Sequence, residues 1–181
     1  NYRQTKSSSS GLLSSSSTTT TDYSLINKGT TLNSGGKLTI KSKDDVIMQS
    51  ASISANGGAS VESKNGSVNV VALHDVKIHD VKKEKTSFSL DVSSDGIKLF
   101  EKSEDTLRTE DYISKGTLLS SGKSFNIEAK EDVNLQNVDF IAKKDITIGA
   151  TNVNIMHGVD KHIQEESHQS MDVGATVTKD G

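Results

Sequence analysis

The chain has 181 residues and a formal net charge of −3, and its lysines are interleaved with aspartates and glutamates, so it lacks the basic patch of a nucleic-acid binder. It contains no cysteine, which excludes disulfides and thiolate metal sites, and no apolar run approaches the about 20 residues of a membrane-spanning helix. Because only 31% of the residues are hydrophobic and 4% aromatic, a folded chain of this kind must bury a thin aliphatic core, as repetitive folds do.

Residues 1–22 are dominated by serine and threonine and contain the run SSSSGLLSSSSTTTT. Such a composition is typical of a flexible linker. However, the segment stands directly before the first of two repeated stretches, in the place that a predicted hairpin occupies before the second. We therefore interpret residues 1–22 as the end of a preceding repeat's excursion and expect it to be a poorly ordered version of that hairpin.

Residues 28–49 and 115–136 align without a gap at an offset of 87 residues, and 11 of the 22 aligned positions are identical. Identity this dense in a short window indicates an internal repeat. Both copies contain short apolar–polar alternations, which predict strands with one buried face. The first copy gives Leu38, Ile40, Val46, Met48, Ile53, Val61, Val68 and Val70; the second gives Phe125, Ile127, Val133, Leu135, Phe140, Ile146, Ile148, Val153 and Ile155.

These strands recur every 7–8 residues, and turn signals such as NSGGK and ANGGA separate them. Because tight two-residue hairpin loops are missing there, the pattern predicts an all-β fold, a parallel β-helix (β-solenoid) with coils of roughly 20 residues stacked about 4.8 Å apart. We assign coils to residues 23–81 and 111–163, with about three coils in each 87-residue unit.

Residues 82–110 interrupt the coils and predict a β-hairpin excursion. Asp95-Gly96 lies between two alternating apolar segments, which is the strongest short hairpin signal. A two-residue loop pairs Val92 with Leu99 and gives the hairpin one apolar face, expected to lie on the solenoid or on a partner. Residues 164–181 are expected to begin the next excursion. The candidate interaction residues are Phe88, Leu90, Val92, Ile97 and Leu99.

Histidines recur at a spacing of five residues, His74 with His79 and His157 with His162. This spacing sends two side chains to opposite faces of a strand, or to positions about 140° apart on a helix. Neither geometry lets a pair chelate an ion, and no third ligand motif accompanies them. We expect exposed or corner histidines and no metal site, with a response to pH left open.

The acidic pairs Asp44-Asp45 and Glu131-Asp132 precede matching strands and suggest acid–base catalysis or Ca²⁺ binding. Adjacent residues on a strand point apart, however, and side chains that cap a corner explain both pairs. The sequence also lacks a G-x-S-x-G elbow, a P-loop and a dinucleotide fingerprint. We therefore expect no catalytic residues, no enzymatic activity and no cofactor.

The segments GTTLNSGGKLTIKSKDDVIMQSASISANGG and GTLLSSGKSFNIEAKEDVNLQNVDFIAKKDITIGATNVNI resemble haemagglutinin repeats of large exoproteins secreted by the two-partner pathway. This family includes filamentous haemagglutinin adhesins and the contact-dependent growth inhibition effectors of Gram-negative bacteria. The stretch after VKIHDVKKEKTSFSLD also resembles such repeats. The likeness covers about residues 23–170.

The resemblance implies a right-handed parallel β-helix on a secreted filament at the Gram-negative cell surface, outside the outer membrane. It implies two partners, an outer-membrane two-partner-secretion transporter and a target-cell surface receptor or the target's outer membrane. In growth-inhibition effectors this region helps deliver a C-terminal toxin into a target bacterium. The chain starts at Asn1 without a visible signal peptide, so we interpret it as part of a longer virulence protein.

Two alternatives from other classes stay open. A carbohydrate-active β-helix enzyme would need carboxylates or basic residues from several coils clustered on one outer face. A host-cell adhesin module built as a β-sandwich would need longer, antiparallel strands and a more aromatic core. Parallel contacts between residue i and roughly residue i+20 would separate the β-helix from the sandwich.

Overall fold

The computed structural model describes the backbone of residues 1–93 and 96–175 and the side chains of residues 1–88 and 99–174. Every regular element in the described part is a β-strand, so the all-β prediction is confirmed. No helix there is long and apolar enough to cross a membrane. The chain divides into two units. The parallel unit comprises Ile26–Asp75 and Tyr112–Asp160, and the antiparallel unit comprises Asn1–Leu25, Val76–Asp111 and the chain from Lys161 onward.

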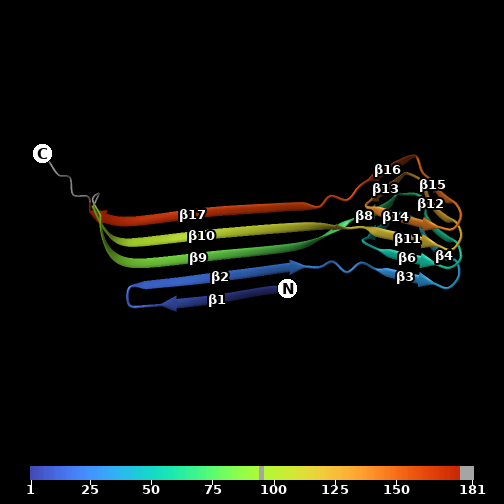
Figure 1. Ribbon diagram of the computed structural model, residues 1–181. Helices are drawn as coiled ribbons and strands as arrows, with labels where there is room; N and C mark the ends of the chain where they lie inside the picture. Colours follow the sequence, from blue (N-terminus) through green and yellow to red (C-terminus); the bar gives the residue numbers. More distant parts are fainter. Residues whose placement is uncertain (94–95, 176–181) are drawn as a thin grey trace. The chain divides into compact units, whose positions relative to one another are not determined.

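The parallel unit contains three four-stranded parallel sheets, and the chain adds one strand to each sheet every time it passes through them (Figure 1). We call three such consecutive strands a pass. Pass one consists of β3 (Thr31–Ser34), β4 (Leu38–Ser42) and β5 (Val46–Gln49). Pass two consists of β6 (Ser52–Ala55), β7 (Ala59–Ser63) and β8 (Val68–Val71). Pass three consists of β11 (Thr117–Ser121), β12 (Phe125–Ala129) and β13 (Asp132–Gln136). Pass four consists of β14 (Val138–Ala142), β15 (Ile146–Gly149) and β16 (Asn152–Met156).

All neighbouring strands in these sheets run in parallel; within a repeat they come from residues about 20 apart, whereas passes two and three pair across the long strands, as Val68 does with Val133. Thr31 pairs with Ser52, and Val133 pairs with Val153. This is the contact pattern expected of a β-helix and the opposite of a sandwich's antiparallel pairing. Each repeat holds two passes rather than the predicted three, because the chain after β8 enters long strands instead of another pass.

The core of the parallel unit is a set of inward side chains stacked from pass to pass. One column consists of Val46, Val68, Val133 and Val153, each opposite the next in the strand register. Val68 and Val133 have no exposed surface, whereas Val153 in the last pass is 43% exposed. Burial is therefore complete in the two inner passes, while the outer passes differ, since Val46 in the first pass is only 8% exposed.

An aromatic contact lies within the same core. Phe125 is fully buried and meets Phe140 of the next pass edge to face, with ring centroids 5.8 Å apart and an interplanar angle of 81°. Such a contact adds to the free energy gained from burying the rings.

The antiparallel unit is one five-stranded sheet in the order β1-β2-β9-β10-β17 (Figure 1). Its strands are β1 (Tyr2–Ser10), β2 (Ser14–Leu25), β9 (Leu73–Ser93), β10 (Gly96–Lys115) and β17 (Lys161–Ala175). The serine- and threonine-rich start, expected to be poorly ordered, is a regular hairpin. Strand β1 pairs with β2 over its whole length, and β2 in turn pairs with β9, so tertiary hydrogen bonding overrides the composition.

The long strands reach beyond the predicted excursion at 82–110. Strand β9 begins at Leu73 and β10 ends at Lys115, inside the segments assigned to coils, and β17 begins at Lys161 rather than 164. Strand β2 pairs with β9 as far as Val76. Hydrogen bonding to β2 therefore extends β9 beyond the apolar–polar alternation from which the hairpin was predicted.

Candidate functional site

The predicted hairpin lies in β9 and β10. Phe88 is 53% exposed and its backbone N–H donates to the carbonyl of Leu13 at 2.7 Å, while Leu99 is half-buried. The side chains of Leu90, Val92 and Ile97 lie outside the described residues, as does Asp95 of the predicted turn. The sequence did not reveal that β9 and β10 are flanked by β2 and β17, which join this hairpin to its neighbours in one sheet.

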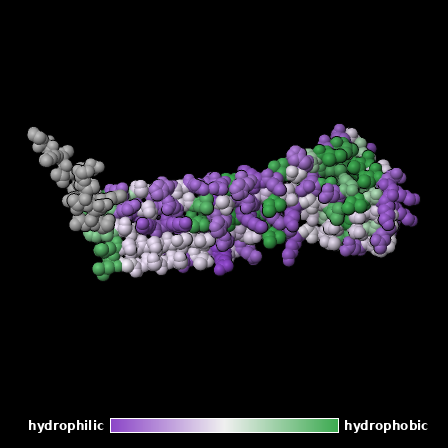
Figure 2. Space-filling view, in the orientation of Figure 1, coloured by the Kyte–Doolittle hydropathy of each residue, from purple (hydrophilic) through white to green (hydrophobic). Residues whose placement is uncertain are grey.

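The antiparallel unit has no buried core among its described residues. All its described side chains are exposed or half-buried, and every fully buried side chain lies in the parallel unit. In Figure 2 the antiparallel strands show mostly white and purple atoms, and green atoms gather over the parallel strands. Contacts between neighbouring strands must therefore stabilise this sheet.

One set of such contacts is an ion-pair network on β9 and β10. Lys82 Nζ lies 3.0 Å from a carboxylate oxygen of Glu84 and 3.1 Å from one of Glu104, and Arg108 lies 3.4 Å from Asp80. The hydrogen bonds to Glu84 and Glu104 raise the pKa of Lys82. The hydrogen bonds from Lys82 and then Ser17 lower the pKa of Glu84. These groups are open to water, which screens their attraction.

A second set joins histidines to aspartates. His79 Nδ1 lies 2.6 Å from Asp22 Oδ1, and His162 Nδ1 lies 2.6 Å from Asp111 Oδ1. His168 makes the same contact with Asp105 on the neighbouring strand. The sequence placed two of these histidines at repeated positions, but their partners are more than 50 residues away, and strand pairing alone brings them together. Among the described residues, no three His, Cys, Asp or Glu side chains gather to hold a metal ion.

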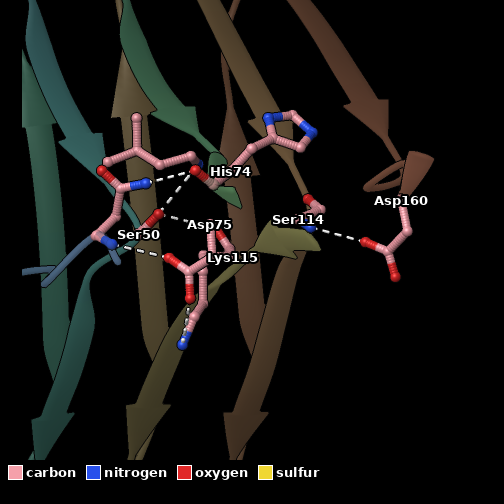
Figure 3. A network of polar contacts seen from close by, with 8 residues as sticks. Ser50, His74, Asp75, Ser114, Lys115 and Asp160 are labelled. Atoms are coloured by element: carbon pink, nitrogen blue, oxygen red, sulfur yellow. Dashed lines mark hydrogen bonds and ion pairs between the residues drawn. The ribbon is translucent and has the colours of Figure 1, made fainter. Parts of the chain in front are cut away.

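A network of polar contacts holds the chain where it leaves pass two and enters pass three (Figure 3). Ser50 Oγ donates to the Lys115 carbonyl at 2.8 Å and accepts the Leu73 backbone N–H at 3.0 Å. One hydroxyl thus bridges the departing and the returning strand. We call Asn27, Ser50, Leu73, His74, Asp75 and Lys115 the junction.

The Asp75 carboxylate makes two further contacts in the junction. Its Oδ1 accepts the Asn27 backbone N–H at 2.8 Å, and its Oδ2 lies 3.4 Å from Lys115 Nζ. The Asn27 side-chain amide donates to the carbonyl of His74 at 2.6 Å. Beyond the repeated residues around Gly29, no sequence pattern signals this site, because its members come from four separate stretches of chain.

The junction has a counterpart in the second repeat. Ser114, which aligns with Asn27, donates its backbone N–H to Asp160 Oδ1 at 2.7 Å. Ser50 and its aligned residue Asn137 both have positive φ, 46° and 51°, and Asn137 donates to Ser114 Oγ at 3.0 Å. A repeated geometry at aligned positions indicates a fixed structural role in anchoring the long strands.

The acidic pairs take the corner positions expected of them. Asp45 Oδ1 accepts the backbone N–H of Ser67 in the next pass at 2.8 Å. Asp132 Oδ1 accepts the Asn152 side-chain amide of its next pass, also at 2.8 Å. Each carboxylate therefore links successive passes.

The comparison with protein families agrees with this organisation. The model of the family described as hemagglutinin repeat matches residues 7–98 and 99–181. No curated protein and no solved structure matches the chain. The two matched segments meet within the β9–β10 hairpin, so each contains a returning strand, two passes and an outgoing strand. The chain belongs to the hemagglutinin repeat family.

Proposed function

We propose that the chain is a non-enzymatic structural and interaction segment of a large secreted exoprotein. Its passes are the coils of a right-handed parallel β-helix, and its long hairpins are excursions from that helix. The proposal extends the expectations of the family to this chain, and the contacts of the two repeats support it.

The observation that carries the proposal is how one repeat lengthens both units. Each repeat adds two strands to every parallel sheet and two strands to the antiparallel sheet. Strands lie about 4.8 Å apart in either kind of sheet, so each repeat extends both by about 10 Å. Because the two increments match, repeats can follow one another without accumulating strain, which suits a long filament built from many copies.

Membership of the hemagglutinin repeat family supports a secreted setting. We place the protein at the exterior of the Gram-negative outer membrane, exported by a two-partner-secretion transporter. The absence of cysteine among the 181 residues suits export as an unfolded chain. The partner on the other side is a receptor or the outer membrane of a target cell, and the role is adhesion or toxin delivery in contact-dependent growth inhibition.

The contact surface we assign to the target is the β9–β10 hairpin. Its apolar residue Phe88 is exposed, and the sheet around it has no described buried side chain. We keep Leu90, Val92, Ile97 and Leu99 as candidate contacts on the strength of the sequence pattern.

The test replaces residues 82–106 with Asn-Gly, a two-residue turn that shortens the hairpin without opening it. Val81 and Leu107 line one groove, so the shortened strands can still meet there. We expect the variant to keep the circular dichroism of the parallel unit and to lose binding to Gram-negative cells or outer-membrane vesicles. Binding that survives this deletion would exclude the hairpin as the contact.

A matched pair of point variants refines the test. Phe88 and Ile141 are similarly exposed, at 53% and 59%, but only Phe88 lies in the hairpin. We expect Phe88→Ser to weaken target binding and Ile141→Ser in β14 to leave it unchanged. Equal effects of both variants would indicate non-specific adhesion through any exposed apolar residue.

The carbohydrate-active enzyme is the rival proposal. Of the acidic pairs Asp44-Asp45 and Glu131-Asp132 that suggested it, Asp45 and Asp132 are engaged in hydrogen bonds between successive passes. Release of reducing sugar ends from acidic polysaccharides by the intact chain would overturn the non-enzymatic assignment. Binding to host cells in preference to bacteria would favour the host-cell adhesin module.

A further inference from the structure

Three of the four described histidines in the strands of the antiparallel sheet face an aspartate on the neighbouring strand; the fourth, His74 at the start of β9, contacts the Val159 carbonyl instead. The pairs are His79 with Asp22, His162 with Asp111, and His168 with Asp105, each joined through Nδ1. A carboxylate only accepts hydrogen bonds, so Nδ1 is the donor in each pair. The side chains are roughly half exposed, from 45% to 65%, so protons reach them freely.

The location of these pairs is selective. Strands β1 and β2 are the arms of one excursion, β9 and β10 are the arms of the next, and β17 begins a third. All three pairs lie where different excursions meet, one between β2 and β9 and two between β10 and β17. We call these two boundaries the seams. Within the β9–β10 excursion, the described cross-strand ion pairs use lysine and arginine instead.

The pairing also recurs between repeats. Asp22 and Asp111 each stand directly before a tyrosine, and His79 and His162 each follow another histidine by five residues. The same two residue types therefore meet beside the same local motifs in both seams. The match is one of local motif, because Asp111 lies 89 residues after Asp22 and His162 lies 83 residues after His79, not 87.

Few other charges face these imidazoles. On the face of His79, Arg3 lies opposite Asp22 in the register, and Lys77 and Asp111 line the same groove. That groove also brings Lys77 near the aspartate of His162, Asp111. Near His168, the groove contains Lys83, Glu166 and its partner Asp105. Cations and carboxylates are thus mixed at each site, and the directly bonded aspartate is the nearest charge.

We propose that the histidine–aspartate pairs make the seams pH-sensitive clasps, which hold successive excursions together in mildly acidic solution and loosen them as the pH rises. Imidazole changes charge between about pH 5 and 8, and the lysine and arginine pairs inside an excursion do not. Protonation places a positive charge on the imidazole beside the aspartate carboxylate, so that each hydrogen bond also becomes an ion pair between opposite charges. The inference stands independently of the proposed function.

Loosening a seam has a structural consequence. It frees backbone donors and acceptors along β2, β9, β10 and β17, which can then accept another strand. A sheet clasped along its seams keeps those edges occupied. The degree of protonation would therefore decide whether the sheet is closed or open to strand exchange.

The test measures amide hydrogen exchange of the intact chain at about pH 5.5 and about pH 8, corrected for the intrinsic rate at each pH. Exposed ion pairs shift an equilibrium by about 1.4- to 5-fold each. We expect seam amides of β9 and β17 to lose protection by up to about fivefold per pair at the higher pH. Amides of β1, which pair inside an excursion, should change less. Equal protection of the seams at both values would overturn the proposal.

Variants assign the effect to each clasp. His79→Gln should abolish the pH dependence of the β2–β9 seam alone, and His162→Gln with His168→Gln that of the β10–β17 seam alone. His79→Lys, which stays charged at both pH values, should keep the acidic level of protection throughout. His157→Gln in the parallel unit is the control and should change neither seam. A seam that keeps its pH dependence without its histidines would contradict the proposal.

Discussion

Val68 and Val133 of the parallel unit have no exposed surface, whereas no described side chain of the antiparallel unit is fully buried. The parallel unit is stabilised by stacked aliphatic and aromatic columns, in which every added pass buries the one before. The antiparallel unit relies on backbone pairing and on polar contacts between neighbouring strands. The comparison teaches that one repeat sequence can extend two sheets by different physical means, and it predicts opposite sensitivities to mutation.

The largest effect is expected in the buried columns. Phe125→Ala removes a fully buried ring that contacts Phe140, which should lower the free energy of unfolding by about 3–5 kcal/mol. Phe88→Ala in the antiparallel unit removes a half-exposed ring and should change the free energy of unfolding by less than about 1 kcal/mol. Urea unfolding followed by circular dichroism measures both. Similar losses would mean that the two units are not stabilised differently.

Close backbone packing in the parallel unit should give the next largest effect. A Cβ at Gly29 would lie 1.6 Å from the Ser50 carbonyl oxygen, so Gly29→Ala forces the two backbone segments apart. This should lower the free energy of unfolding by about 2–3 kcal/mol. At Gly35 no atom lies within 4 Å of an added Cβ. Gly35→Ala is therefore the matched control and should leave the thermal midpoint nearly unchanged. A neutral Gly29→Ala would show that adjacent passes can separate at little cost.

The junction should contribute less than the core. Asp75→Ala leaves the Asn27 backbone N–H without its acceptor and Lys115 without its partner, which should cost about 1–2 kcal/mol. Lys115→Met removes the ion pair and keeps the backbone hydrogen bond, so its effect should be smaller. Chemical denaturation of both variants measures the difference. If Lys115→Met cost as much as Asp75→Ala, the ion pair and not the backbone contact would anchor the strands.

The smallest effect belongs to the exposed ion pairs of the antiparallel unit. Lys82→Met should lower the denaturation midpoint slightly at low salt and have no effect at high salt, because ions screen exposed charges. The lowered pKa of Glu84 contributes stability that is present above its ordinary value of 4.5 and is lost as the pH falls through the folded value.

The partner of Glu84 shows the reverse dependence. The raised pKa of Lys82 contributes stability below its ordinary value of 10.5, which is lost as the pH rises through the folded value. The Lys82 pairs should therefore be constant between about pH 5.5 and 8, the window in which the histidine clasps change. Denaturation midpoints measured across the pH range check this, and a Lys82→Met effect that varied within that window would contradict the assignment.

Local patterns predicted more of the fold than of the candidate site. The alternation around Val68 and Val133 and the dense repeat at Gly29 and Gly116 were enough to predict short parallel strands with about 20 residues per coil. The number of passes per repeat was overestimated because the side-chain alternation of a long, exposed strand resembles that of a short strand with one buried face. The junction was missed because Ser50, Asp75 and Lys115 carry no local signal and meet only after the strands are in place.

The sequence by itself determined the repeat, the all-β character and the inward aliphatic positions, because strand periodicity is a local property of neighbouring residues. Only the tertiary structure decided that the serine- and threonine-rich start is a strand pair, since β2 of that pair is also hydrogen-bonded to β9, far along the chain. The pairing of His79 with Asp22 was decided in the same way, through strand register over 57 residues of separation. Long-range backbone hydrogen bonding sets these contacts, and no local pattern encodes it.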